Sequence, residues 1–131
     1  MQAEFPEQVR AVIRYDEALG RLLYGGADIF LMPSRYEPCG LTQMIAMRYG
    51  CVPVVHATGG LKDTVRDGET GFLFPDATAG SMEEGIRQAL TSYAKPKTWK
   101  ELQYQGMRMD FSWHRSARQY ARIYRSLIFD S

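Results

Sequence analysis

The stretch from residue 27 to residue 65, ADIFLMPSRYEPCGLTQMIAMRYGCVPVVHATGGLKDTV, constrains the fold more than any other part of the chain. It begins with a near-continuous apolar run at residues 29–33, which is typical of a strand buried on both faces of a parallel sheet. A glycine turn follows, then a helix at about residues 41–49 and a second apolar strand at residues 52–55. This order is a βαβ unit, whose crossover is right-handed. The chain is therefore predicted to have an α/β fold.

Local patterns predict the remaining elements. Residues 8–14 are short, partly alternating and β-branched, which indicates a strand. Asp16 is a candidate N-cap for a helix that Gly25 and Gly26 end. A polar turn is expected at residues 64–70, followed by a short strand at residues 71–74. Three late helices are predicted from their caps: Ser81 with Glu84 before residues 82–93, Thr98 with Glu101 before residues 99–109, and Ser112 before an apolar stripe that runs from Trp113 to Ile128.

The number of strands is low for a nucleotide-binding domain. Doubly wound domains have about six strands, whereas only three or four are predicted within these 131 residues. We expect residues 1–131 to be part of one domain, a partial Rossmann-like parallel sheet with flanking helices, in a larger protein. Apolar surface left by the missing strands is expected to promote self-association.

Composition excludes several classes of partner. Sixteen basic and fifteen acidic residues give a net charge of +1, so no bulk field favours nucleic acid or an anionic membrane. No segment has the roughly 20 apolar residues of a membrane span, and the first residues lack a signal peptide. Cys39 and Cys51 lie at opposite ends of one predicted helix, beyond disulfide reach. The two histidines are isolated, so no metal site is expected.

Two polar turns are predicted to share one rim. Ligands of open α/β sheets bind beyond the carboxyl ends of the strands, and both turns follow such ends. Unpaired N–H groups at a helix N-terminus bind phosphate, and Gly40 permits close approach of a ligand. The turn from Cys39 through Leu41 to Thr42 is therefore a candidate pyrophosphate site, with the Thr42 hydroxyl as an extra donor. The alternative is a glycine required for tight packing of strand against helix.

Other residues near this rim suit different parts of a ligand. Glu37 would repel phosphate, so it is better suited to accept hydrogen bonds from sugar hydroxyls; alternatively it is an exposed loop carboxylate. Thr58, Gly59 and Gly60 offer a second backbone approach, or form an ordinary turn. Tyr15 can stack on a base, or serve as a core or rim aromatic.

Residues 33–65, PSRYEPCGLTQMIAMRYGCVPVVHATGGLKDTV, closely resemble the bacterial glycogen synthase and plant starch synthase family. Its members are retaining glycosyltransferases of the GT-B fold that transfer glucose from ADP-glucose to the non-reducing end of an α-1,4-glucan. The flanks at residues 15–18, 67–72 and 111–113 agree as well, so the resemblance covers nearly the whole chain. Broader GT-B relatives carry a second glutamate where this chain has Ile45, which favours the synthase subgroup.

The resemblance implies a role for each candidate residue and no metal or cofactor beyond the donor. Glu37, as the catalytic residue, would bind the hydroxyls of the donor glucose. The backbones of Cys39, Gly40 and Leu41 would contact glucose and phosphate, and Thr42 would bind phosphate. Tyr15 would lie against the adenine, and Thr58, Gly59 and Gly60 would lie near the donor. The glucan acceptor and an N-terminal domain of the same enzyme are the implied partners.

That N-terminal domain is absent here, as is the upstream Arg/Lys pair that neutralises the leaving diphosphate. The isolated chain is therefore expected to have negligible activity. The resemblance implies the cytoplasm for a bacterial source and the plastid stroma for a plant source. Two alternatives remain: another GT-B transferase that uses UDP-glucose, and a non-catalytic domain that binds nucleotide or glucan.

Overall fold

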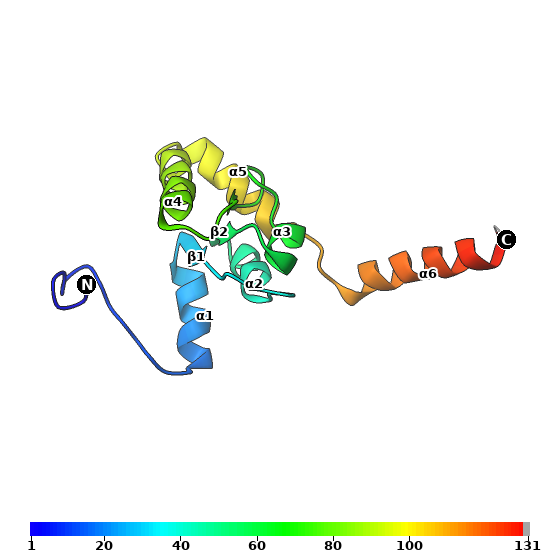
Figure 1. The fold of residues 1–131 in the computed structure, drawn as a ribbon, viewed down its shortest axis with the longest axis horizontal. Helices are drawn as coiled ribbons and strands as arrows, with labels where there is room; N and C mark the ends of the chain where they lie inside the picture. The colour runs from blue at the N-terminus through cyan, green and yellow to red at the C-terminus, as the bar shows by residue number, and fades with distance from the viewer. Residues whose placement is uncertain (130–131) are drawn as a thin grey trace.

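The computed structural model describes residues 1–129 of the chain, and its centre is a three-stranded parallel sheet (Figure 1). The strand order is β1 (Ile29–Met32), β2 (Val52–His56) and β3 (Phe72–Phe74). β1 and β2 pair with Ile29 opposite Val52. Every residue of the central strand β2 is buried. The predicted α/β fold and its central βαβ unit are confirmed.

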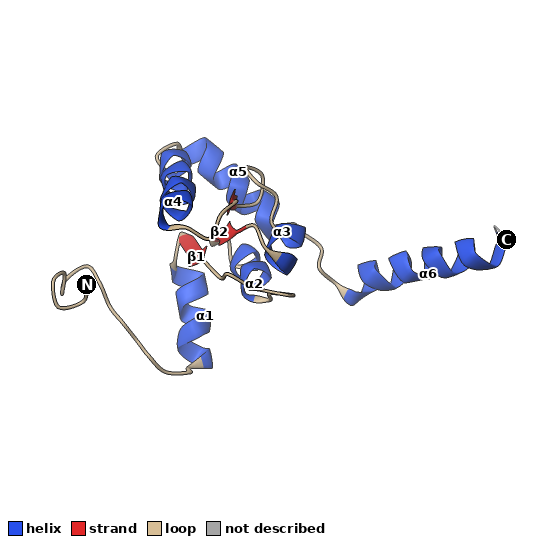
Figure 2. Ribbon diagram, viewed as in Figure 1, coloured by secondary structure: helices blue, strands red, loops and turns tan. Residues whose placement is uncertain are grey.

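Helices lie around this sheet, except for the last one, which extends away from it (Figure 2). In chain order they are α1 (Glu17–Gly26), α2 (Thr42–Arg48), α3 (Gly59–Thr64), α4 (Ala79–Tyr93), α5 (Pro96–Met107) and α6 (Trp113–Phe129). Asp16 caps α1 as predicted, since its carboxylate accepts a hydrogen bond from the Leu19 amide at 3.0 Å.

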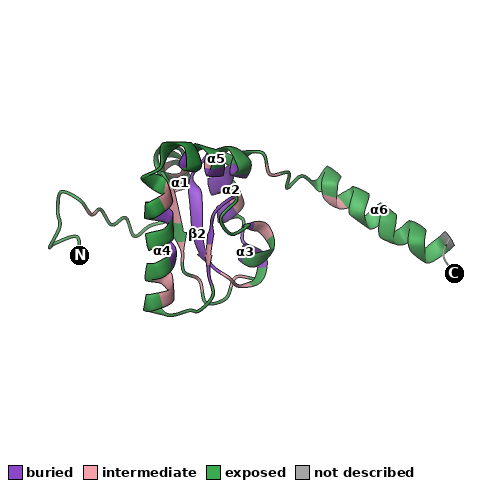
Figure 3. Cartoon of the chain, turned by 90° about the horizontal axis from the view of Figure 1, so that it is seen from above, coloured by how far each residue is buried: buried purple, intermediate pink, exposed green. Residues whose placement is uncertain are grey.

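Alternation along the strands divides the core into two layers, one on each face of the sheet (Figure 3). Val54 and Phe72 point to the face that α4 and α5 cover, where they pack with Trp99. Val55 points the other way and packs with Leu61 on the side of α2 and α3.

The predicted strand at residues 8–14 is wrong. This segment forms no ladder, and Val12 and Ile13 are 53% and 98% exposed. The Ala11 amide donates to the side chain of Gln2 instead of to β1. A short apolar run becomes a strand only where another strand accepts its backbone hydrogen bonds, and this segment has no such neighbour.

The predicted starts of two late helices are wrong. Thr78, not Ser81, caps α4, and its hydroxyl accepts a hydrogen bond from the Ser81 amide at 3.2 Å. α5 begins at Pro96, ahead of the predicted Thr98, because proline suits the first turn of a helix. Ser112 does accept from the Arg115 amide at the start of α6, as predicted.

The last helix and the first residues extend away from the body of the molecule in opposite directions (Figure 1). None of the side chains of α6 from Trp113 to Ile128 is buried, and Trp113 and Leu127 are 87% and 70% exposed. Within residues 1–129 no helix combines the length and the apolar character that a membrane crossing requires.

Candidate functional site

Two segments meet beyond the carboxyl ends of β1 and β2 and form what we call the glycine corner, residues 37–42 together with residues 58–60. The Gly60 amide donates to the Glu37 carbonyl at 3.1 Å, which joins the two segments directly. A Cβ atom on Gly60 would lie 1.6 Å from the Cys39 carbonyl oxygen, and one on Gly59 would lie 2.1 Å from the Glu37 carbonyl oxygen. Only glycine allows this contact between backbones.

The segment 58–60 was predicted to be a turn, but it begins a helix. Thr58 is the N-cap of α3 and Gly59 is its first residue, with φ at +41°. Two glycines at the start of a six-residue helix give little helical signal. The close packing against residues 37–39 and the buried Leu61 place this helix. A polar turn was predicted at residues 64–70, but its first residue, Thr64, is the last residue of α3.

Gly40 adopts a left-handed conformation with φ at +66°. A Cβ atom there would lie 2.6 Å from Oε1 of Gln43, so the amide of Gln43 fills the space under the turn. The requirement for glycine is therefore both conformational and steric.

The start of α2 lacks a capping side chain. Its N-cap residue is Leu41, whose side chain is 66% exposed and has no acceptor for the first amides of the helix. The Thr42 hydroxyl donates to the sulfur of Met32 at 3.0 Å, and a thioether is a weak acceptor. A better acceptor, such as a phosphate oxygen, can therefore replace Met32 as the partner of this hydroxyl.

The structure brings Glu37, Cys39 and Thr58 into the corner but does not pack Tyr15 against it. Glu37 is half-buried, and within residues 1–129 no hydrogen bond or ion pair holds its carboxylate. Cys39 is an exposed free thiol. Tyr15 precedes α1 and is 91% exposed. Its predicted contact with a base remains a prediction.

His56, the last residue of β2, connects this strand to the loop that follows β1. Its Nδ1 lies 2.8 Å from the carbonyl oxygen of Ser34, and because a carbonyl can only accept, Nδ1 carries the proton. The ring also packs near Phe74, with 5.7 Å between centroids. This bond between positions 34 and 56 holds the loop that leads to Glu37, a role that the sequence pattern did not indicate.

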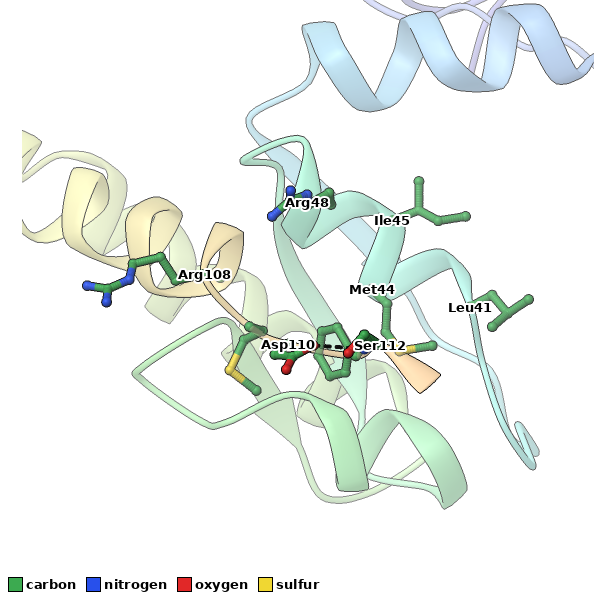
Figure 4. A pocket seen from close by; sticks show the side chains of 10 residues that line it. Leu41, Met44, Ile45, Arg48, Arg108, Asp110 and Ser112 are labelled. Carbon is green, nitrogen blue, oxygen red and sulfur yellow. Dashed lines mark hydrogen bonds between the residues drawn. The ribbon is translucent and has the colours of Figure 1, made fainter. Parts of the chain in front are cut away.

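A cavity of about 570 Å³ lies beside the corner, between α2 and the connection from α5 to α6 (Figure 4). Leu41 belongs to both the corner and the cavity wall. Arg48 donates to the Met107 carbonyl at 2.9 Å, which ties α2 to the end of α5. The Asp110 carboxylate accepts from the Ser112 amide at 2.9 Å. Hydrogen bonds from Ser112 hold the pKa of Asp110 below its usual value, aided by nearby arginines.

The two thiols differ in their surroundings. Cys51 is buried next to β2, and burial, with a smaller contribution from the charge of Asp28, raises its pKa to about 11. Residues 1–129 contain no group of three or more His, Cys, Asp or Glu side chains that could hold a metal ion.

The fold and the corner define a class of protein, the α/β domains that bind a ligand beyond the carboxyl ends of a parallel sheet. The family described as "Glycosyl transferases group 1" matches residues 2–106. The chain belongs to this family.

Relatives within the family share much of this sequence. A glycogen synthase of Nitrosomonas eutropha is 50% identical to this chain, and the match covers 95% of this chain. A glycogen synthase of Marinobacter nauticus is 47% identical, and the match covers 98% of this chain. Among solved structures, the chain matches the catalytic domain of starch synthase IV from Arabidopsis thaliana, bound to ADP and acarbose, with a TM-score of 0.84, 40% identity and 94% of the chain covered. Sucrose-phosphate synthase from Thermosynechococcus elongatus matches with a TM-score of 0.71 and 31% identity over 99% of the chain.

The chain is much shorter than these relatives. It spans 26% of the Nitrosomonas enzyme, 28% of the Marinobacter enzyme, 27% of the starch synthase chain and 33% of the sucrose-phosphate synthase chain.

Proposed function

We propose that this chain is the later part of the C-terminal nucleotide-sugar-binding domain of a glycogen or starch synthase. In the whole enzyme, glucose is transferred with retention from ADP-glucose to the non-reducing end of an α-1,4-glucan. The hydrogen bond between Gly60 and Glu37 carries the proposal, because it joins the loop at residues 37–42 and the start of α3 into one corner with a carboxylate and an uncapped helix start. The glycogen synthases at 47–50% identity and the ADP-bound starch synthase support it.

In this proposal each part of the corner binds a different part of the donor. The amides from Cys39 to Thr42 and the Thr42 hydroxyl bind the diphosphate, and Glu37 accepts hydrogen bonds from the glucose hydroxyls. Tyr15 lies against the adenine. Gly59 and Gly60 support the loop through their backbone contacts and lie near the donor.

The reaction then proceeds at the anomeric carbon. Its bond to the diphosphate oxygen breaks, negative charge develops on the leaving group, and the acceptor hydroxyl attacks from the same face and passes its proton to the departing phosphate oxygen. Stabilisation of that charge is usually a large part of catalysis. The cations and the N-terminal domain that provide it come from the rest of the enzyme, so the chain alone has negligible activity. The enzyme acts in the cytoplasm of a bacterium or in the plastid stroma of a plant.

Calorimetric titration of the 131-residue chain with ADP, ADP-glucose, UDP and UDP-glucose tests the proposal. We expect saturable binding of the adenine nucleotides and weaker binding of the uridine ones. Glu37→Gln should weaken ADP-glucose binding and leave ADP binding unchanged, because the carboxylate contacts only the sugar. Glu83→Gln, on the exposed face of α4, is the matched control.

The other outcomes identify the alternatives. Preference for UDP-glucose would indicate a different transferase of the same fold. Binding of a glucan without any nucleotide would indicate a non-catalytic binding domain.

A further inference from the structure

A buried series of hydrogen bonds connects the two segments of the glycine corner. Gln43 is completely buried, and its Nε2 donates to the Gly40 carbonyl and to the Thr64 hydroxyl, both at 2.9 Å. The Thr64 hydroxyl donates in turn to the Gly60 carbonyl at 2.5 Å. This series of hydrogen bonds thus runs from the turn before α2 to the first turn of α3.

The orientation of the Gln43 amide follows from its partners. The Gly40 carbonyl only accepts hydrogen bonds, so the amide nitrogen must face it. This orientation leaves Oε1 of Gln43 buried and without a hydrogen-bond partner among the described residues. A buried unpaired acceptor costs about 1–3 kcal/mol. The unpaired Oε1 of Gln43 therefore lowers the stability of the fold, while Nε2 satisfies one acceptor in the corner, the Gly40 carbonyl, and one in α3, the Thr64 hydroxyl.

From these contacts we infer that Gln43 and Thr64 are positioning residues, which hold the Gly40 turn and the start of α3 in the geometry that binds the donor. This inference rests on the proposed function. Neither side chain touches the donor. Gln43 acts by fixing the left-handed Gly40 turn, and Thr64 acts by orienting the Gln43 amide and holding Gly60, whose own amide binds the Glu37 carbonyl.

Three substitutions in the 131-residue chain separate positioning from general stability. Gln43→Met keeps the length of the side chain and removes both donors. Thr64→Val removes the hydroxyl at nearly constant volume, and Thr64→Ser retains it. Thr91→Val is the matched control, because the Thr91 hydroxyl makes the same type of bond, to the Arg87 carbonyl four residues earlier, on the exposed helix α4.

The first measurement is the dissociation constant for ADP-glucose, taken well below the melting transition so that every variant is folded. We expect Gln43→Met and Thr64→Val each to weaken binding about tenfold, as loss of a net hydrogen bond would. The double variant should bind ADP-glucose no more weakly than the weaker-binding single variant, because both substitutions interrupt the same series of hydrogen bonds. Thr64→Ser and Thr91→Val should bind like the wild type.

The second measurement is amide hydrogen exchange at residues 40–42 and 59–60 without nucleotide. We expect faster exchange there in Gln43→Met and Thr64→Val, and wild-type rates in Thr64→Ser and Thr91→Val. If the wild type binds no nucleotide sugar, the proposed function is wrong, and exchange alone decides the positioning roles. If the wild type binds and both variants bind and exchange like it, the inference is wrong and the function stands. Should Gln43→Met not fold, the Thr64→Val and Thr64→Ser pair decides.

Discussion

Position 60 allows one residue because the backbone of the neighbouring turn occupies the space of a side chain. A Cβ atom on Gly60 would lie 1.6 Å from the Cys39 carbonyl oxygen and 2.8 Å from the Cys39 Cα. These are backbone atoms, so no rotamer change relieves the overlap. We expect Gly60→Ala to lower the free energy of unfolding by about 3 kcal/mol, the upper range for overpacking. Urea unfolding followed by circular dichroism measures this.

Gly80 provides the control for this substitution. A Cβ atom there would meet nothing within 4 Å, and the residue lies in the first turn of α4. Gly80→Ala should leave stability unchanged or raise it by less than about 1 kcal/mol. Equal unfolding free energies for Gly60→Ala and the wild type would show that Gly60 does not pack against the backbone of Cys39.

The two cysteines should differ in reactivity toward a thiol reagent. Cys39 is exposed, whereas Cys51 is 1% exposed and burial raises its pKa to about 11. The thiolate is the reactive form, and a raised pKa makes it scarcer at a given pH. We expect one thiol per native chain to react rapidly at about pH 8, and both to react in concentrated guanidinium chloride. Cys39→Ser should remove the rapid phase, and a rapid phase that survives it would contradict the burial of Cys51.

Among the secondary-structure elements, the start of α4 gives a direct test of capping. The Thr78 hydroxyl accepts from the Ser81 amide, so Thr78→Ala should lower the free energy of unfolding by about 1 kcal/mol. Thr98 was predicted to cap the next helix but lies inside α5 and is exposed. Thr98→Ala should change stability by less than about 0.5 kcal/mol. Thermal unfolding of the two variants compares them, and equal losses would contradict the cap at Thr78.

The start of α6 should loosen on acidification. Hydrogen bonds from Ser112 lower the pKa of Asp110 in the folded chain. A lowered carboxyl pKa contributes stability above its unfolded value of about 3.9, and this contribution is lost as the pH falls through the folded value. The Ser112 amide resonance should therefore follow this titration in NMR spectra. Asp110→Asn should abolish the acid-dependent shift, and a shift that persists in this variant would assign it to another group.

The sequence predicted the elements whose apolar runs pack on near neighbours in the chain. β1, α2 and β2 follow this rule, since their runs pack on one another within one βαβ unit. The expectation that β1 is buried on both faces is wrong, because β1 is an edge strand of the described sheet and Leu31 is 39% exposed. Residues 8–14 carry the same kind of pattern but have no strand to pair with. α3 was missed because its two glycines have low helix propensity, and its position depends on backbone contact with Cys39.

The same limit applies to the candidate site. The glycine turn at Gly40 and the unpaired amides at the start of α2 are local features, and the sequence indicated both. The bond between Gln43 and Thr64 spans 21 positions, and the His56 bond to Ser34 spans 22. Such partners are recognised only when the helices, strands and loops that carry them lie side by side in the fold, so no motif revealed Gln43, Thr64 or His56.

For the whole molecule, the isolated helix α6 presents a row of exposed apolar side chains. Trp113, Tyr124 and Leu127 are each at least 60% exposed. We expect a chain truncated before residue 113 to keep the wild-type unfolding free energy within about 0.5 kcal/mol. The full chain should associate with rising concentration, and the truncated chain much less. Light scattering across a concentration series measures this. A strictly monomeric full chain would contradict the expectation.

Because one thiol is accessible and the other is buried, this chain has a natural site for attaching a thiol-reactive label. A fluorophore coupled to Cys39 would stand beside Gly40, where the proposed donor arrives, and no second cysteine would have to be removed to make the labelling selective. The unmodified sequence can thus report occupancy of its own corner as an optical signal.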